Sequence, residues 1–81
     1  NLVTSKTELY ASHSTTGHNH TGQEEVYIFC SGSGEMEINE KRFKVKEGDI
    51  IFIEAGDFHR VHNTSKEKLE FVCVFDGARS H

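Results

Sequence analysis

The sequence predicts a small all-β domain built as an antiparallel sandwich or barrel, and three observations lead to this fold class. Short segments alternate apolar and polar residues with a period of two, turn-forming residues separate them, and no window of ten or more residues shows a helical period. The chain has 81 residues, enough for one domain only. Leu, Ile, Val and Phe make up about 25% of it, above the roughly 20% below which disorder is typical.

The expected strands follow from the residues in chain order. The segment 4–10 is ambiguous and is assigned to a strand, whereas 25–30 is rich in aromatic and β-branched residues and ends at Ser-Gly-Ser-Gly. Residues 35–46 predict a β-hairpin, because apolar residues alternate with polar ones on both sides of a polar turn at 39–42. Further strands are expected at 50–54, 59–62 and 69–75. The chain contains no proline, so glycine, Asn and Asp must form the turns.

Charge and the length of apolar runs exclude two classes of partner. Thirteen acidic residues against nine basic ones give a net charge of −4, and the basic cluster at 41–46 is flanked by Glu40 and Glu47. No nucleic-acid partner is expected, since phosphate binding requires clustered Lys and Arg on one face. No membrane partner is expected either, because the longest apolar run, 50–53, is far too short to span a bilayer.

The two cysteines indicate the redox compartment rather than a site. Cys30 and Cys73 are too few for a disulfide scaffold and lack the CxxC spacing of redox and zinc sites. They are expected to be two buried thiols in a cytoplasmic protein. Periodicity alone does not decide whether the two side chains face each other.

The spacing of the histidines suggests a metal site. His18 and His20 stand two residues apart, so on a strand both imidazoles project from one face. A strand that crosses back beside them would bring Glu25 to the pair, and two imidazoles with one carboxylate resemble a facial triad with open positions. His59, at the start of a later strand, could complete the set. Such ligands suit a divalent transition metal, although a His-x-His pair by itself also occurs on surface hairpins.

The joint spacing of these residues resembles a known family. One set, within residues 12–32, consists of His18, His20, Glu25 and Gly32. A second set, within residues 48–63, consists of Gly48, Gly56, His59 and Asn63. In order and spacing the two sets resemble the two motifs of the cupin superfamily, and the likeness covers most of the chain. Two positions depart from these motifs: Ser12 stands where a glycine is usual, and Glu54 where a proline is usual.

The resemblance implies a fold and a metal centre. It implies one cupin domain over residues 1–81, folded as an antiparallel jelly-roll β-barrel, the double-stranded β-helix. It also implies one divalent transition metal per chain inside the barrel (Fe, Mn, Ni, Co, Cu or Zn), the alternative being a cupin that has lost its metal. The implied metal ligands are His18, His20, Glu25 and His59. If Glu25 points inward, strand alternation adds Tyr27 and Phe29 to the pocket lining, and Val61 shares the face of His59.

The fold by itself does not choose a reaction. The leading hypothesis is an enzyme that uses the metal to act on a polar small molecule, with chemistry like that of a sugar isomerase or epimerase, a lyase or a dioxygenase. The alternative is a non-catalytic module that binds a sugar or another small molecule, and a third reading is a barrel that serves mainly for assembly. An enzyme needs an acid or base beyond the metal ligands, and Glu24, Tyr27 and Glu54 are the candidates.

Three further expectations concern the surroundings of the site. Asn63 is expected to fix the turn after His59, and His13 and His62 are expected on the surface. The chain is expected to form a homodimer, because a single small barrel leaves sheet edges and an apolar outer face uncovered. Residues 1–11 are the segment expected to pair across that interface.

Overall fold

The computed structural model describes residues 2–17 and 24–76, and the regular elements in them are all β-strands. In chain order they are β1 (Leu2–Leu9), β2 (Glu25–Ser31), β3 (Ser33–Ile38), β4 (Lys41–Lys46), β5 (Ile50–Ile53), β6 (His59–His62) and β7 (Leu69–Asp76). The strands expected from the sequence are confirmed, including the ambiguous first one. None of these residues belongs to a helix long and apolar enough to cross a membrane.

The turn of the β3–β4 hairpin is shorter than the sequence suggested. The expected turn covers residues 39–42, but β4 begins at Lys41. Asn39 adopts a left-handed φ of 56°, which lets the chain reverse within residues 39 and 40. Asn tolerates this left-handed conformation because its short polar side chain can hydrogen-bond locally, so both strands extend closer to the turn.

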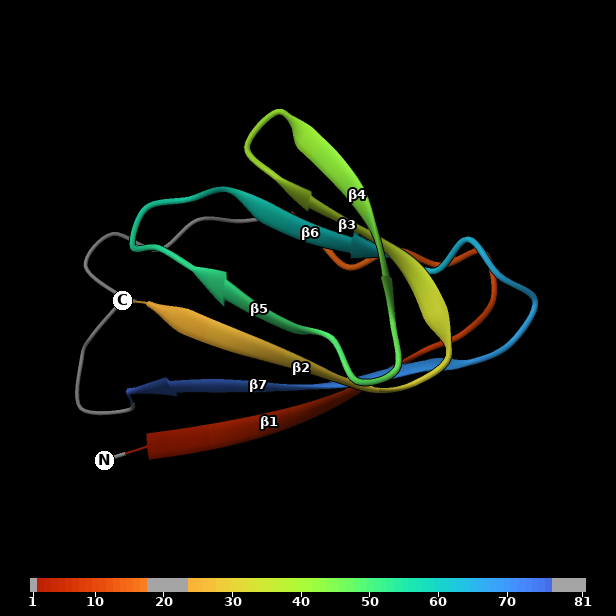
Figure 1. Ribbon diagram of the computed structural model, residues 1–81, viewed down its shortest axis with the longest axis horizontal. Helices are drawn as coiled ribbons and strands as arrows, with labels where there is room; N and C mark the ends of the chain where they lie inside the picture. The colour runs from red at the N-terminus through yellow and green to blue at the C-terminus, as the bar shows by residue number, and fades with distance from the viewer. Residues whose placement is uncertain (1, 18–23, 77–81) are drawn as a thin grey trace.

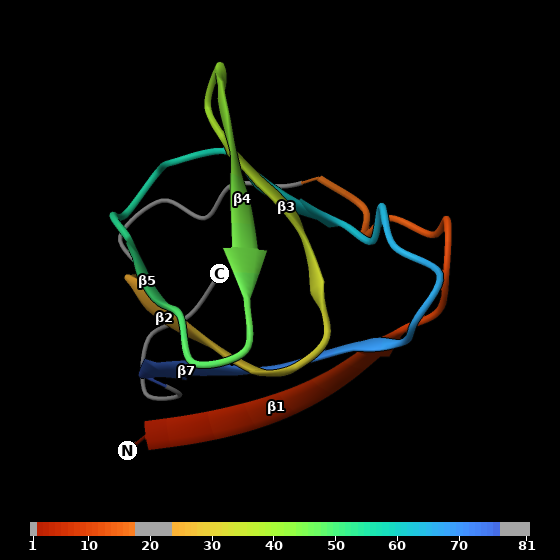
Figure 2. The same ribbon diagram turned by 45° about the vertical axis from the view of Figure 1, so that its right-hand side comes forward.

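The strands form two antiparallel sheets that face each other (Figures 1 and 2). One sheet has the order β1-β7-β2-β5, and the other has the order β4-β3-β6. None of the neighbouring strands in the first sheet are consecutive in sequence: β7 lies between β1 and β2, and β2 pairs with β5. This is the jelly-roll arrangement expected from the resemblance, and the described strands leave the barrel incompletely closed.

The core lies between the two sheets and follows from strand alternation. Along β2, β6 and β7 buried residues alternate with half-buried ones, so every second side chain points inward. The buried hydrophobic residues are Leu9, Tyr27, Phe29, Met36, Val45, Ile53, Val61, Leu69, Phe71 and Cys73. The aromatic rings pack together, with the centroids of Phe29 and Phe71 5.4 Å apart. A buried acid and a buried histidine share this interior with the apolar side chains.

The segment after β1 runs along the free side of β6. The amide of Thr15 donates to the carbonyl of Val61 at 2.9 Å, and the amide of Asn63 donates to the carbonyl of His13 at 2.9 Å. These bonds continue the second sheet past β6 and carry the chain to residue 17 beside the start of that strand.

The first strand makes its contacts within its own chain. β1 pairs with β7 along its whole length, from Leu2 opposite Asp76 to Leu9 opposite Leu69. An ion pair between Lys6 and Glu70, 3.2 Å apart, supports the pairing. The N-terminal segment that was expected to pair across a dimer interface therefore uses one edge inside the molecule.

Candidate functional site

Glu25 and His59, two of the four predicted ligands, meet inside the barrel. Glu25 is the first residue of β2 and His59 is the first residue of β6, so the two side chains come from opposing sheets. Both side chains are buried, with exposed fractions of 7% and 2%, and Oε1 of Glu25 lies 3.6 Å from Nε2 of His59. Burying a carboxylate is costly unless it gains a partner, so this pair indicates a site that binds a cation or holds a proton.

The ring of His59 is oriented by the backbone beside it. Nδ1 lies 3.0 Å from the carbonyl oxygen of Asp57, and because a carbonyl can only accept, Nδ1 donates in this contact. Nε2 then faces Glu25 and, in the neutral ring, carries the lone pair. Two ligands of one transition metal, at bond lengths of about 2.0–2.2 Å, lie roughly 3.0–3.5 Å apart. The 3.6 Å between Oε1 and Nε2 therefore fits a shared metal ion after a small adjustment.

The other two predicted ligands, His18 and His20, lie outside the described residues. The structure describes the chain up to residue 17 and again from residue 24. Gly17 packs against Phe58, so closely that a Cβ on the glycine would lie 2.2 Å from Cζ of the ring, and Glu24 directly precedes the buried carboxylate. The two ends of the intervening segment therefore lie beside the chain neighbours of His59 and of Glu25. Among residues 2–17 and 24–76, no group of three or more His, Cys, Asp or Glu side chains has the geometry of a metal site.

Cys73 and Tyr27 surround the Glu25 carboxylate. Sγ of Cys73 lies 3.1 Å from Oε1 of Glu25, and the thiol donates to the carboxylate. Burial, and then the hydrogen bond to Glu25 and the charge of that carboxylate, raise the pKa of the Cys73 thiol to about 12. The ring of Tyr27 meets the ring of His59 edge-on with centroids 5.7 Å apart, and stacks on Phe71 at 5.3 Å. Burial also raises the pKa of Tyr27, so thiol and phenol both stay protonated at neutral pH.

The two motifs, the facing sheets and the buried pair agree with one family. A family model described as a Cupin domain matches residues 6–75. The chain belongs to the cupin family. Both motif regions, 12–32 and 48–63, lie within the matched residues, so the resemblance expected from the sequence is confirmed.

This cupin is similar to several longer proteins. It is 37% identical over 57 residues to a protein of Thermotoga maritima named as an oxalate-binding protein, covering 70% of this chain and 47% of that protein. It is 33% identical over 64 residues to an uncharacterized protein of Methanocaldococcus jannaschii, covering 79% of this chain and 51% of that protein. The chain spans about half the length of these relatives.

Solved structures support the same fold. A predicted oxalate decarboxylase of Thermotoga maritima superposes with a TM-score of 0.86 at 32% identity, covering 90% of this cupin and 64% of that chain. A double-stranded β-helix protein of Klebsiella pneumoniae superposes with a TM-score of 0.93 at 21% identity, covering 99% and 70% of the two chains. The second likeness shows the fold alone.

The three residues expected to line the pocket all point between the sheets. Tyr27, Phe29 and Val61 expose 7%, 1% and 1% of their surface. Tyr27 contributes to the site through its ring contact with His59. Phe29 packs on the ring of Tyr27 with centroids 6.5 Å apart and belongs to the apolar core beneath the pair. Strand alternation thus identified the inward side chains of both strands.

The two glutamates proposed as acid or base candidates lie outside the buried site. Glu24 and Glu54, proposed as acids or bases, are exposed.

Sequence reasoning missed the contact of Cys73 with Glu25. Alternation could place Cys73 on the inner face with the other buried residues of β7, but its partner depends on the β2–β7 register. In that register Tyr27 stands opposite Cys73, and Glu25 is the diagonal neighbour.

Two predictions about the surface need correction. The prediction that Cys30 is buried is wrong: it is exposed, because the odd-numbered residues of β2 point inward. His62 is less exposed than expected, with 13% of its side chain accessible. Its Nδ1 lies 2.8 Å from Oγ of Ser14 and its Nε2 lies 3.0 Å from Oε1 of Glu37, so it ties the segment after β1 to the second sheet. His13 is exposed, as predicted.

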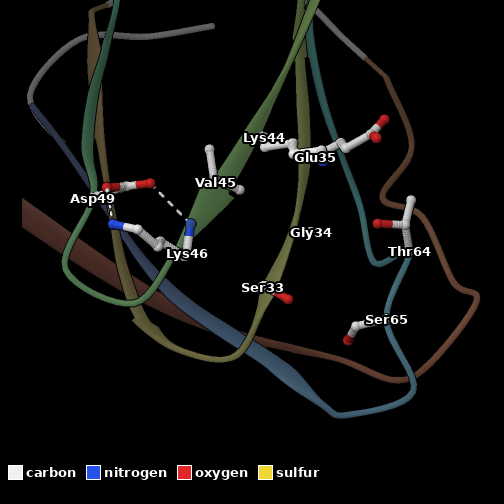
Figure 3. Close-up of a pocket in the computed structure, with 9 residues that line it drawn as sticks. All are labelled: Ser33, Gly34, Glu35, Lys44, Val45, Lys46, Asp49, Thr64 and Ser65. Carbon is white, nitrogen blue, oxygen red and sulfur yellow. Dashed lines mark hydrogen bonds and ion pairs between the residues drawn. The ribbon is translucent and has the colours of Figure 1, made fainter.

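A separate groove of about 460 Å³ lies between β3, β4 and the segment after β6 (Figure 3). Its lining consists of Ser33, Gly34, Glu35, Lys44, Val45, Lys46, Asp49, Thr64 and Ser65. Nζ of Lys46 lies 3.7 Å from Asp49, whose carboxylate also accepts a hydrogen bond from the Lys46 amide at 2.8 Å. The groove shares no residue with the candidate metal centre.

Proposed function

We propose that this cupin binds a small carboxylate anion on one divalent transition metal held inside the barrel. The proposed metal ligands are His18, His20, Glu25 and His59. The observation that supports the proposal best is the buried approach of Oε1 of Glu25 to Nε2 of His59, at 3.6 Å. When bound, such a metal supplies a Lewis acid toward the oxygens of the anion. The donor set of imidazoles and one carboxylate suits Fe, Mn, Ni, Co, Cu or Zn.

Oxalate is the first anion to test. One relative is named as an oxalate-binding protein, and one structural neighbour as a predicted oxalate decarboxylase. Oxalate offers two carboxylates whose oxygens can take two adjacent positions on one metal, so it suits a centre with open positions. The ring of Tyr27, which contacts His59 and stacks on Phe71, would exclude water and strengthen the attraction between metal and anion.

The described residues favour binding over catalysis. A general base must be deprotonated near the reacting atoms. Glu24 and Glu54 are exposed, and the raised pKa of Tyr27 keeps its phenol protonated at neutral pH. Apart from the proposed ligands, the described side chains next to Glu25 and His59 are Tyr27 and Cys73. Both are protonated, so they can donate hydrogen bonds but cannot act as a general base. The second candidate function is an enzyme, as the sequence alone suggested, and the position of Tyr27 next to His59 favours it, because the phenol could donate a proton to a bound anion.

Metal content tests the proposal directly. Protein purified without a metal-affinity column should contain about one transition metal per chain by elemental analysis. The His59→Ala variant should lose at least tenfold in metal affinity, because it removes a ligand. His13→Ala, which removes an exposed histidine, is the matched control and should keep its metal. Protein that neither contains a metal nor takes one up on incubation would contradict the proposal.

Calorimetry with oxalate then tests the ligand. Metal-loaded protein should bind oxalate and metal-free protein should not, while acetate, with one carboxylate, should bind at least tenfold more weakly. Release of carbon dioxide and formate from oxalate would decide for the enzyme, since cleavage of the carbon–carbon bond gives these two products. Equal binding of oxalate with and without metal would contradict a metal-held anion.

A further inference from the structure

The thiol of Cys73 contacts the one buried carboxylate of the described core. Cys73 is 8% exposed, and its Sγ lies 3.1 Å from Oε1 of Glu25. An ionised carboxylate only accepts hydrogen bonds, so the S–H group is the donor. The contact is between a side chain of β7 and one of β2, two strands that pair directly. It is therefore held by the sheet itself rather than by a mobile loop.

The thiol acts on the oxygen that faces His59. Oε1 of Glu25 is the atom 3.6 Å from Nε2 of His59, and the same atom accepts from Cys73. A carboxylate oxygen has lone pairs for two partners. One of them is directed to the thiol, which leaves the other for a metal ion between Glu25 and His59. The hydrogen bond thus fixes the orientation of the donor atom that the metal would use.

The side chain of Tyr27 lies beside the thiol. Tyr27 stands directly opposite Cys73 in the β2–β7 register, so the two inward side chains are cross-strand neighbours. The ring of Tyr27 is in turn stacked on Phe71, 5.3 Å away, which restricts its movement. The thiol thus has a ring of restricted movement as its cross-strand neighbour and the carboxylate of the predicted ligand as its hydrogen-bond partner. Hydrogen bonds of this kind to a ligand usually affect metal affinity 10–100-fold.

We propose that Cys73 is a positioning residue of the metal centre: its thiol orients the carboxylate of Glu25 and strengthens metal binding without itself binding the metal. The proposal rests on the function proposed above. Cys73 would act through Glu25, so its substitution should change the affinity for the metal rather than the number of metal ions bound. A serine at this position keeps a donor, whereas alanine or valine does not.

Titration of the metal-free protein with Co²⁺, followed by visible absorption, tests this role. Cys73→Ala should weaken Co²⁺ binding about tenfold, and Cys73→Val, which fills the space of the thiol, should do the same. Cys73→Ser should stay within about threefold of the unmodified protein. Cys30→Ala is the matched control, because it removes the exposed cysteine on the other face of β2, and it should change nothing. Circular dichroism of each variant confirms the fold.

The outcomes separate the two proposals. Unchanged Co²⁺ affinity in a folded Cys73→Ala or Cys73→Val variant overturns the role of Cys73 and leaves the proposed function intact. A thiolate-to-cobalt charge-transfer band that disappears in Cys73→Ala also overturns it, because Cys73 would then be a ligand. Failure of the unmodified protein to bind Co²⁺, or any other transition metal, overturns the proposed function together with this inference.

Discussion

At the scale of single residues, Asn63 shows how one buried amide can define a turn. Its side chain is 2% exposed. Nδ2 donates to the carbonyls of Leu9 and Glu67 at 2.8 and 2.7 Å, and Oδ1 accepts from the amide of Ser65 at 3.0 Å. The amide thereby joins the end of β1 to the turn after β6. The sequence prediction that Asn63 fixes this turn is confirmed.

Replacing Asn63 should therefore destabilise the fold. Asn63→Ala leaves the buried carbonyl of Leu9 and the partly buried carbonyl of Glu67 without this donor. An unsatisfied buried group costs about 1–3 kcal/mol, so we expect a loss of about 3 kcal/mol in the free energy of unfolding. Urea denaturation followed by circular dichroism measures it. The exposed neighbour Thr64→Ala is the control and should stay within about 0.5 kcal/mol. Similar losses in the two variants would show that the amide network contributes little.

Part of the candidate site could be predicted from the sequence, because the spacing of the motif residues along the chain indicates it. Glu25 and His59 follow from the motif spacing, and strand alternation then places Tyr27 on the inner face. The contact of Cys73 with Glu25 could not be predicted in this way, because it depends on how β2 and β7 are aligned. A shift of one residue in that register would turn Cys73 to the other face. Spacing along one strand contains no information about its neighbour.

At the scale of elements, the turn between β2 and β3 depends on a glycine with two separate requirements. Gly32 has a φ of +87°, and a Cβ there would lie 2.4 Å from the carbonyl oxygen of Lys68. Gly48, before β5, has a φ of +94°, but a Cβ there would meet no heavy atom within 4 Å. The first glycine thus needs both conformational freedom and space, whereas the second needs conformational freedom alone.

The two glycines form a matched pair of substitutions. Gly48→Ala should cost about 1–2 kcal/mol of unfolding free energy, the usual cost of a left-handed residue with a Cβ. Gly32→Ala should cost at least about 2 kcal/mol more, because the backbone of residue 68 must move to admit the methyl group. Thermal and urea denaturation of both variants measure the difference. Equal losses would contradict the steric part of the argument.

The alternation of apolar and polar residues predicted the strands, and it also predicts which face of β2 each side chain occupies. The same pattern that places Tyr27 and Phe29 inside places Cys30 outside, as the structure shows. The length of the hairpin turn was harder to predict. It depends on the left-handed conformation of Asn39, a local choice that hydrophobic periodicity does not report.

At the scale of the whole molecule, the outer faces of the two sheets differ in character. On β2, β5 and β7 the side chains opposite the core form two cross-strand rows, Phe52-Val26-Val74 and Ile50-Ile28-Val72. Ile50 and Phe52 remain 67% and 54% exposed. The outer face of the other sheet carries charged and polar residues, namely Glu35, Glu37, Arg42, Lys44, Arg60 and His62. Exposed large apolar side chains lie on the first face, at Ile50 and Phe52, whereas Lys6 and Glu70 form an ion pair on its β1–β7 side. Covering the apolar side chains of that face is favourable.

We predict that two copies of the chain associate through the apolar face. In a two-fold dimer each row meets the same rows of the partner, so one self-complementary surface is enough. Sedimentation of the 81-residue chain at micromolar concentration should then give twice the monomer mass of 9.2 kDa. Phe52→Glu places a charge in one of the two apolar rows, on the edge strand β5, and should shift the chain to monomer, weakening association at least tenfold.

A substitution on the opposite face separates this interface from a general effect of charge. Lys44→Glu changes the charge of an exposed residue on β4 and should leave the dimer unchanged. Metal content measured on the same samples shows whether association matters for the candidate centre, which lies within one barrel. If the unmodified chain sediments as a monomer over the whole concentration range, the apolar face is not a contact between copies of this chain. If Lys44→Glu dissociates the dimer as strongly as Phe52→Glu, the contact lies on another surface, because β4 belongs to the other sheet than β2, β5 and β7.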